Sequence, residues 1–319
     1  MLSMLEKRRA IDMVKSLEKK DNKMIQISNS PTITLLGGTG HVGKVYIEEF
    51  LRSGFNVKVL ARSPGCVKRH FPDAEIVHGS MMQDADVSRA MNGATAAFLI
   101  TPIGGNNYTE PELMAARAAI AGAKASQLPH LIYASQILPE RPTGVAILDA
   151  KVEIEKMFAA SGISWSSLCI GCYMDEWLGM APHLQKLGLL FNPISRTLPL
   201  SFTLKEDVAG VAVELLRKGK ILNGTLDVIE PVAHTLSEVA SLISQFRERK
   251  MIASGSWPWS ALLGMAQPLF RRFKPVMASK VSLLRHFNKN GYVGNTKQMS
   301  EILPQFKVTT METYLNMSF

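Results

Sequence analysis

The chain has 319 residues, of which 46% are hydrophobic and 20% charged, as in ordinary folded proteins rather than disordered ones. No uninterrupted apolar run approaches the roughly 18–20 residues that a membrane-spanning helix needs. The net charge of +9 lies in short basic clusters without a zinc-finger or RNP-like pattern, so we expect neither a nucleic-acid nor a membrane partner.

Residues 1–30 combine acidic with basic side chains and lack the apolar run of a signal peptide. Three cysteines cannot build a disulfide framework, which favours a reducing, cytoplasmic location. We expect this segment to be a mobile extension with one helical stretch around Ala10–Leu17.

From residue 32 onward, predicted strands alternate with predicted helices. A β-rich run at 32–36, a helix-like segment at 44–52 and a second strand at 57–61 make one βαβ unit. Later strands are predicted at 75–78, 96–100, 130–134 and 164–170, with helices at 85–91, 110–126 and 150–161. This alternation predicts an α/β fold, a doubly wound Rossmann-type parallel sheet covered on both faces.

The alternation breaks near residue 173. Helices are predicted at 175–190, at 207–216 and from Thr235 or Ser237 to 247, and strands at 198–202 and 225–229. We therefore expect a Rossmann domain over 31–173, with returning segments near 196–229. Residues 174–195 and 230–319 are expected to form a smaller C-terminal lobe.

Three glycines lie between the first strand and the first helix, in the pattern Gly37-x-x-Gly40-x-x-Gly43. Such a turn needs backbone angles that glycine adopts without strain, and the missing side chains let a pyrophosphate approach the helix N–H groups. The position of the triplet favours a dinucleotide site over an unliganded turn. The residues expected to line this site are Gly37, Thr39, Gly40, His41, Val42 and Gly43.

The end of the second strand distinguishes between the two nicotinamide cofactors. An acid there binds the ribose hydroxyls of NAD, whereas an arginine accommodates the additional phosphate of NADP. The sequence has Arg62 and Ser63 at this point and no acid before Asp73. It therefore predicts NADP(H), with a solvent-facing arginine as the alternative.

These residues resemble the atypical short-chain dehydrogenase/reductase group, most closely the NmrA-like family with its isoflavone-reductase-like relatives. The resemblance covers roughly residues 32–245 and includes Gly79-Ser80, Thr101-Pro102, the strand 132–135 and Lys151. It implies NADP(H) at the carboxyl edge of the sheet and a C-terminal lobe that covers a substrate cleft. By position, Gly79, Ser80 and Met81 are expected near the adenine, and Thr101, Pro102 and Ile103 near the nicotinamide.

The chain departs from ordinary short-chain dehydrogenases at their Tyr-x-x-x-Lys motif. Counting back from Lys151 gives Ile147, which has no proton to donate, and neither Tyr133 nor Tyr173 has the required spacing. In isoflavone-reductase-like proteins the matching lysine is assigned to acid–base work, and burial can lower a lysine pKa toward neutrality. We rank contact between Lys151 and the cofactor ribose first, proton transfer second and a surface lysine last.

Further candidates end the fifth and sixth strands. We expect Ser135 near the cofactor and Gln136 near the substrate, with hydrogen bonding inside the core as the alternative. Tyr173, Met174 and Trp177 are expected to line the substrate pocket, although their spacing also fits core packing. Cys169 and Cys172 form a C-x-x-C on a late strand, which favours buried apolar thiols over redox or metal chemistry. We expect no metal site.

The leading functional hypothesis is an NADPH-dependent reductase of a small apolar or aromatic substrate. One alternative keeps the fold but drops the redox step, as in an isomerase, lyase or cyclase. Another is a non-enzymatic NADP(H) sensor that binds a partner protein. The sequence leaves a homodimer open.

Overall fold

The computed structural model describes residues 30–102, 109–139, 142–179, 182–254, 265 and 275–318. Residues 1–29 of the extension expected over 1–30 lie outside them. The chain divides into two units, Met1–Pro31 and Thr32–Phe319, and the second unit contains every described helix and strand. Among the described residues, no helix is both long enough and apolar enough to cross a membrane.

The centre of the second unit is a seven-stranded parallel sheet with the strand order β10-β6-β5-β4-β1-β2-β3. The strands are β1 (Thr32–Leu36), β2 (Asn56–Ala61), β3 (Glu75–His78), β4 (Ala96–Leu99), β5 (Leu131–Gln136), β6 (Trp165–Ile170) and β10 (Gly224–Val228). The strand order reverses between β1 and β4, which is the topological switch point of a doubly wound sheet. The predicted fold class is confirmed.

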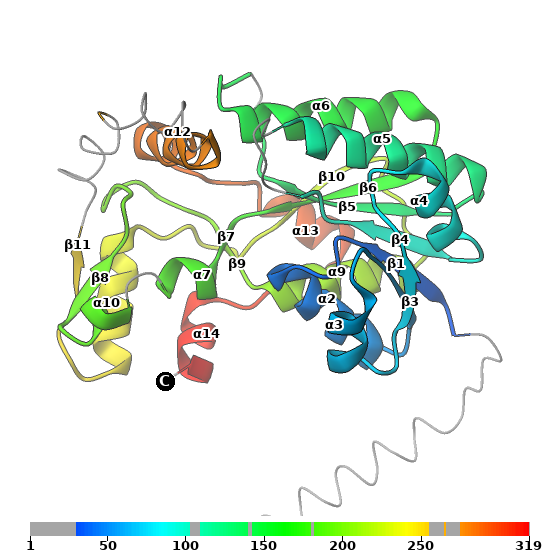
Figure 1. Cartoon of the computed structure of the whole chain (residues 1–319). Coiled ribbons are helices and arrows are strands. Elements are labelled where there is room, and N and C mark those ends of the chain that lie inside the picture. Colours follow the sequence, from blue (N-terminus) through cyan, green and yellow to red (C-terminus); the bar gives the residue numbers. More distant parts are fainter. Residues whose placement is uncertain are drawn as a thin grey trace, which may run out of the picture. The chain divides into compact units, whose positions relative to one another are not determined.

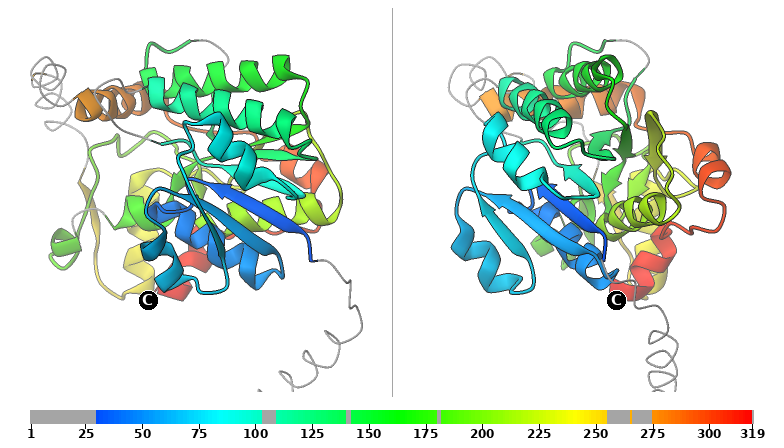
Figure 2. Two further views of the ribbon diagram at one scale, coloured as in Figure 1. Left: turned by 45° about the vertical axis from the view of Figure 1, so that its right-hand side comes forward. Right: turned by 90° about the vertical axis from the view of Figure 1, so that its right-hand side faces the viewer.

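Helices cover both faces of the sheet (Figure 1). One face carries α2 (His41–Arg52), α3 (Pro64–His70) and α9 (Lys205–Arg217), and the other α4 (Asp84–Met91), α5 (Glu110–Ala125) and α6 (Ala146–Ser161). The last two helices lie side by side in every view (Figures 1 and 2). Because both faces are covered, successive residues of β4 are buried in opposite cores, with Phe98 in one and Leu99 in the other.

The remaining elements form smaller structures beyond the carboxyl edge of the sheet and along its β10 side. They are β7 (Cys172–Tyr173), α7 (Met174–Leu178), α8 (Pro182–Gln185), β8 (Leu189–Phe191), β9 (Phe202–Thr203), α10 (Leu236–Phe246), β11 (Ile252–Ser254), α12 (Pro275–Asn290), α13 (Lys297–Ile302) and α14 (Met311–Ser318). Strands β7 and β9 pair with each other, as do β8 and β11. Helices α10, α12 and α14 contribute to a second hydrophobic core.

Two predicted elements of this region are wrong. The single helix expected over 175–190 is instead α7, α8 and the strand β8, because Gly179 and Pro182 interrupt it and Gly188 turns the chain with φ +82°. The strand expected at 198–202 is reduced to β9 and an isolated bridge at Leu200. By contrast, α10 begins as predicted, because the Thr235 side chain and Glu238 form a capping box.

Candidate functional site

The glycine turn after β1 is required by close backbone packing at two of its three positions. Gly37 has φ +94°, and a Cβ there would lie 2.3 Å from the Ile100 carbonyl oxygen. A Cβ on Gly43 would lie 2.6 Å from the Gly37 carbonyl oxygen. At Gly40 the nearest protein atom would be 3.8 Å away, so the protein's own packing does not explain that glycine. A ligand that approaches the backbone at Gly40 would explain it.

The N-terminus of α2 is arranged to receive an anion. Gly40 is its N-cap in an extended conformation, no side chain caps the helix, and its first turn holds no acid. The first N–H groups of a helix have no partner within the helix and carry a partial positive charge. They therefore offer a diphosphate a set of backbone donors.

A groove of about 450 Å³ runs along the carboxyl ends of β1 to β4. Its lining consists of Gly37, Thr39, Gly40, His41, Val42, Gly43, Leu60, Ala61, Arg62, Gly79, Ser80, Met81, Met82, Ile100, Thr101 and Pro102. Of the residues expected at the cofactor, Ser63 is exposed and does not line the groove, and Ile103 lies outside the described residues. Sequence reasoning missed four apolar wall residues: Leu60, Ala61 and Ile100 at strand ends, and Met82 in the loop after β3.

Asp86 positions the loop after β3 at one end of this groove, and sequence reasoning missed it. Its Oδ2 accepts a hydrogen bond from the Ser80 backbone N–H at 2.8 Å, and its Oδ1 lies 2.7 Å from Arg89. The hydrogen bond from Ser80, together with Arg89, lowers the pKa of Asp86. The same carboxyl group excludes a side chain at Gly79, where a Cβ would lie 2.8 Å from Oδ2. An acid in the first turn of the next helix was the available sequence signal.

A second cavity, of about 330 Å³, adjoins the groove and shares Val42, Ile100 and Thr101 with it. The rest of its lining is Ala134, Ser135, Gln136, Lys151, Ile170, Gly171, Cys172, Tyr173, Glu176, Trp177, Leu283, Phe287 and Tyr292. Gln136, Tyr173 and Trp177 are among the residues expected at the substrate. Ser135 and Lys151, expected at the cofactor, lie in this cavity rather than in the groove.

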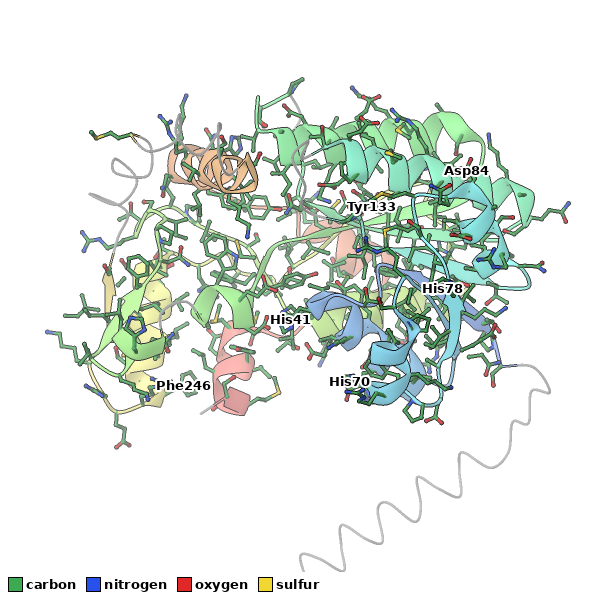
Figure 3. The ribbon with its side chains drawn as sticks, viewed as in Figure 1. His41, His70, His78, Asp84, Tyr133 and Phe246 are labelled. Atoms are coloured by element: carbon green, nitrogen blue, oxygen red, sulfur yellow. The ribbon has the colours of Figure 1, made fainter. Side chains whose placement is uncertain are left out.

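The expected pocket position of Met174 is wrong. Its side chain is fully buried in the core that α10, α12 and α14 share, and it does not line the cavity. One residue later in the chain, Asp175 points back toward the groove, where its Oδ2 lies 3.9 Å from His41. Figure 3 shows His41 at the start of α2, facing α7.

Aromatic side chains from the C-terminal region line one wall of the cavity. The ring centroids of Trp177 and Phe287 are 6.1 Å apart, and those of Phe287 and Tyr292 are 4.3 Å apart. The Tyr292 hydroxyl donates to the Ile170 carbonyl at 2.9 Å and accepts from the Ile137 N–H at 2.9 Å. Tyr292 is therefore anchored to the end of β6, and the wall is built from aromatic rings. Sequence reasoning missed Phe287 and Tyr292, because no periodicity links them to the sheet.

Lys151 reaches the cavity from α6 but is held in a buried polar cluster. Its Nζ lies 3.2 Å from Glu112 Oε2, 3.2 Å from the Tyr133 hydroxyl and 3.4 Å from the Thr101 hydroxyl. Tyr133 belongs to β5 and faces the helices α5 and α6 (Figure 3). The side chains of Lys151 and Glu112 are 5% and 0% exposed, so the ion pair is shielded from water.

The sequence left open whether burial lowers the Lys151 pKa, and in this structure its pKa is raised instead. Burial does lower this pKa, but the attraction of Tyr133 and Glu112 outweighs burial and raises it above its ordinary value. Lys151 is therefore a protonated hydrogen-bond donor at neutral pH. A lysine that stays charged cannot abstract a proton, although it can bind a hydroxyl group.

Tyr173 and Glu176 form the opposite side of the cavity. The hydroxyls of Tyr173 and Tyr46 share a hydrogen bond of 2.8 Å, and burial raises the pKa of Tyr173 well above its ordinary value. Lys205 lies 5.1 Å from the centre of the Tyr173 ring and pairs with Asp175 at 2.6 Å and Glu176 at 2.9 Å. These contacts fix the start of α7 against α9.

Of the two polar side chains at the end of β5, one has its hydrogen-bond partner and the other has an atom that lacks one. The Ser135 hydroxyl donates to Glu155 Oε1 at 2.8 Å, and burial raises the pKa of Glu155. The Gln136 Oε1 atom is buried without a hydrogen-bond partner. Since Gln136 lines the cavity, its amide is the polar group there that still needs a partner.

Cys169 and Cys172 are buried and not joined in a disulfide. Burial raises the pKa of both thiols well above its ordinary value, which disfavours the thiolate that nucleophilic, redox and metal-binding cysteines need.

Comparisons with known proteins agree with this geometry. The sequence model of the NmrA-like family matches residues 29–315, a longer span than the resemblance read from the motifs. A reductase of (4-alkanoyl-5-oxo-2,5-dihydrofuran-3-yl)methyl phosphate from Streptomyces griseus is 29% identical over 69% of this chain and 75% of its own. An NAD(P)H azoreductase from Xenophilus azovorans is 24% identical over 66% and 72%, respectively. The NADPH complex of the quinone oxidoreductase QOR2 from Escherichia coli has a TM-score of 0.71 at 20% identity, over 90% of this chain and 99% of that one.

Proposed function

Because the chain belongs to the NmrA-like family, we propose that it is an NADPH-dependent reductase of a small, largely apolar or aromatic substrate. One observation carries the proposal: the dinucleotide groove and the aromatic cavity meet at Val42, Ile100 and Thr101. A nicotinamide at this junction would have its ring against whatever fills the cavity. The named relatives that reduce quinones, azo compounds and a butenolide phosphate support a reductase.

The residues of the groove fit NADP(H). The open backbone at Gly40 and the uncapped N-terminus of α2 suit the diphosphate. The exposed Arg62 stands at the end of β2, where its guanidinium would bind a 2′-phosphate with two parallel hydrogen bonds. When bound, NADPH supplies the hydride, and the protein supplies the orientation of the two reactants.

Lys151 would bind the cofactor rather than act as a base. It lies at the junction beside Thr101, and its neighbours keep it protonated. A charged amine of this kind suits a ribose hydroxyl, which is the first-ranked role from the sequence. No tyrosine stands four residues before it, so we propose that the reaction proceeds without the Tyr-x-x-x-Lys proton donor.

The cavity favours an uncharged substrate. Among the described residues that line it, Lys151 is the sole cation, and Glu112 already neutralises it. Glu176, the other charged residue of the lining, is an acid that shares Lys205 with Asp175. A phosphate group such as that of the Streptomyces relative's substrate would therefore find no available counter-charge, whereas a neutral ring would stack on Trp177 and Phe287. The Gln136 Oε1 atom, which lacks a partner, would accept a hydrogen bond from a hydroxyl on that ring.

Steady-state loss of reduced-nicotinamide absorbance tests the proposal. We expect turnover of NADPH with neutral quinones or aryl ketones, and weaker turnover with phosphorylated analogues of similar size. Product formed without a change in nicotinamide absorbance would favour the isomerase, lyase or cyclase alternative. Tight NADPH binding without turnover of any neutral acceptor would favour the sensor alternative.

A further inference from the structure

Three side chains that neither cavity uses come together beyond β10. Glu230 and His234 lie in the loop between β10 and α10, and Glu312 lies in the first turn of α14. One ligand atom from each of the three lies within 4.8 Å of the others. None of them lines the dinucleotide groove or the aromatic cavity. The cluster is therefore separate from the proposed active site.

The spacing of the inner pair already matches metal coordination. His234 Nε2 lies 3.3 Å from Glu230 Oε2. Two ligand atoms at about 2.1 Å from a tetrahedral zinc ion lie about 3.4 Å apart. Glu230 and His234 would thus need little movement to bind one ion. Glu312 is exposed, so its side chain is able to complete the set by a change of rotamer.

Glu230 supplies an independent sign of a missing partner. Its side chain is 1% exposed. Its Oε2 atom accepts hydrogen bonds from the Met311 backbone N–H at 2.9 Å and from His234 Nε2 at 3.3 Å, but its Oε1 atom is buried and has no hydrogen-bond partner among the described residues. A buried carboxylate oxygen without a partner is costly, and a bound cation would satisfy it.

Solvent and ions have access to this cluster. A shallow cavity of about 460 Å³ is lined by His234 and Glu312 together with Val232, Ala233, Ser237, Glu238, Ser241 and Leu242. It provides the entry path that a metal site requires, and it leaves room for water at the remaining coordination positions.

We propose that Glu230, His234 and Glu312 form a site for a divalent first-row transition ion, with zinc as the representative. One imidazole with two carboxylates suits such an ion better than Mg²⁺ or Ca²⁺, which prefer oxygen ligands alone. Because Glu312 belongs to α14 and the other two belong to the loop before α10, the bound ion joins α14 to that loop.

Titration calorimetry with zinc chloride on chelator-treated, full-length protein tests the site. We expect one ion per chain in a non-phosphate buffer, and at least tenfold weaker binding in Glu312→Gln and in His234→Gln. Glu312 is exposed, so its substitution leaves the fold intact. Glu301→Gln, an exposed acid on α13, is the matched control and should bind zinc as the unmodified chain does.

Two further measurements keep the test decisive. Zinc should raise the thermal unfolding temperature of the unmodified chain but not of Glu312→Gln, and magnesium should raise neither. Cobalt(II) should give the visible absorption of a nitrogen–oxygen site that His234→Gln lacks. The proposal is overturned if zinc does not bind, or if Glu312→Gln and His234→Gln bind it as tightly as Glu301→Gln does.

Discussion

We propose that the exposed guanidinium of Arg62, at the end of β2, distinguishes between the two nicotinamide dinucleotides. A 2′-phosphate carries about two negative charges, and a charge-assisted hydrogen bond contributes about 1.5–3 kcal/mol before solvent weakens it. We expect Arg62→Ala to weaken NADPH binding roughly tenfold and to leave NADH binding within about twofold. Fluorescence titration with both dinucleotides measures this, and Arg196→Ala, another exposed arginine, is the control. An equal loss for both cofactors would contradict the assignment of Arg62.

The buried pair of Glu112 and Lys151 gives a second prediction at the scale of residues. Removing one partner leaves an uncompensated charge at positions that are 0% and 5% exposed. Such a loss costs about 3–5 kcal/mol. We expect Glu112→Leu and Lys151→Met each to destabilise the fold strongly, and the double variant to be more stable than the sum of the two losses allows. Urea unfolding of the four proteins measures this coupling, and strictly additive losses would refute it.

Residue types and motif spacing predicted most of the groove lining but less of the cavity. The glycines, Arg62 and Thr101 follow strand ends, and strand ends meet at one edge of a parallel sheet. The position of the Met174 side chain depends on the core of the C-terminal lobe. The pKa of Lys151 depends on Glu112, which is distant in sequence. No local pattern contains that information.

At the scale of elements, the turn before α2 contains one glycine that packing requires, Gly43, and one that packing does not require, Gly40. A Cβ at Gly43 would lie 2.6 Å from backbone atoms, whereas one at Gly40 would lie 3.8 Å from the nearest protein atom. We expect Gly43→Ala to lower the thermal unfolding temperature clearly. Gly40→Ala should leave that temperature almost unchanged and weaken NADPH binding. If Gly40→Ala binds NADPH normally, the diphosphate does not lie against this turn.

Asp207 links α9 to the chain just before α14 and gives a prediction on pH. Its Oδ2 accepts the Thr309 N–H at 2.7 Å, yet burial raises its pKa from 3.8 to about 6. The folded state therefore holds this proton at a pH where the unfolded state has released it, so stability falls as pH rises from about 4 to 6. This contribution is on the order of 2–3 kcal/mol.

Substitution isolates this contribution from those of other acids. We expect the stability of the unmodified chain relative to Asp207→Asn to decrease by that amount between pH 4 and pH 7. Urea unfolding at several pH values measures the difference, with Glu301→Gln as the control that changes no slope. A difference that is constant across this range would show that Asp207 ionises normally.

Elements of the sheet were more predictable than those of the lobe, for a physical reason. Strands such as β4 and β6 are buried on both faces, so their apolar runs stand out from the chain. The segment from α7 to β8 has short elements whose apolar residues serve a separate core, and Gly179 and Pro182 break its helical pattern. The helical spacing of apolar residues over 175–190 therefore does not correspond to one helix.

At the scale of the whole molecule, the two cavities depend on different parts of the chain. The groove is built from the first four strand ends, whereas the aromatic wall consists of Trp177, Phe287 and Tyr292, of which Tyr292 contacts the end of β6. The glycine triplet between the first strand and the first helix predicted the dinucleotide site that became the groove. It left the wall unidentified, since Trp177, Phe287 and Tyr292 meet only through tertiary packing.

This division predicts that substrate binding and cofactor binding respond separately to substitution. Trp177→Ala removes one aromatic surface from the cavity and touches nothing in the groove lining. Losing that stacking surface costs about 1–2 kcal/mol. We expect the KM for a neutral quinone to rise about tenfold, with the Kd for NADPH within about twofold of the unmodified chain. Leu187→Ala, at an exposed apolar side chain outside both cavities, should change neither constant. If the Kd for NADPH rose in parallel with KM, the aromatic wall would support the cofactor instead, and the cavity would lose its assignment as the substrate site.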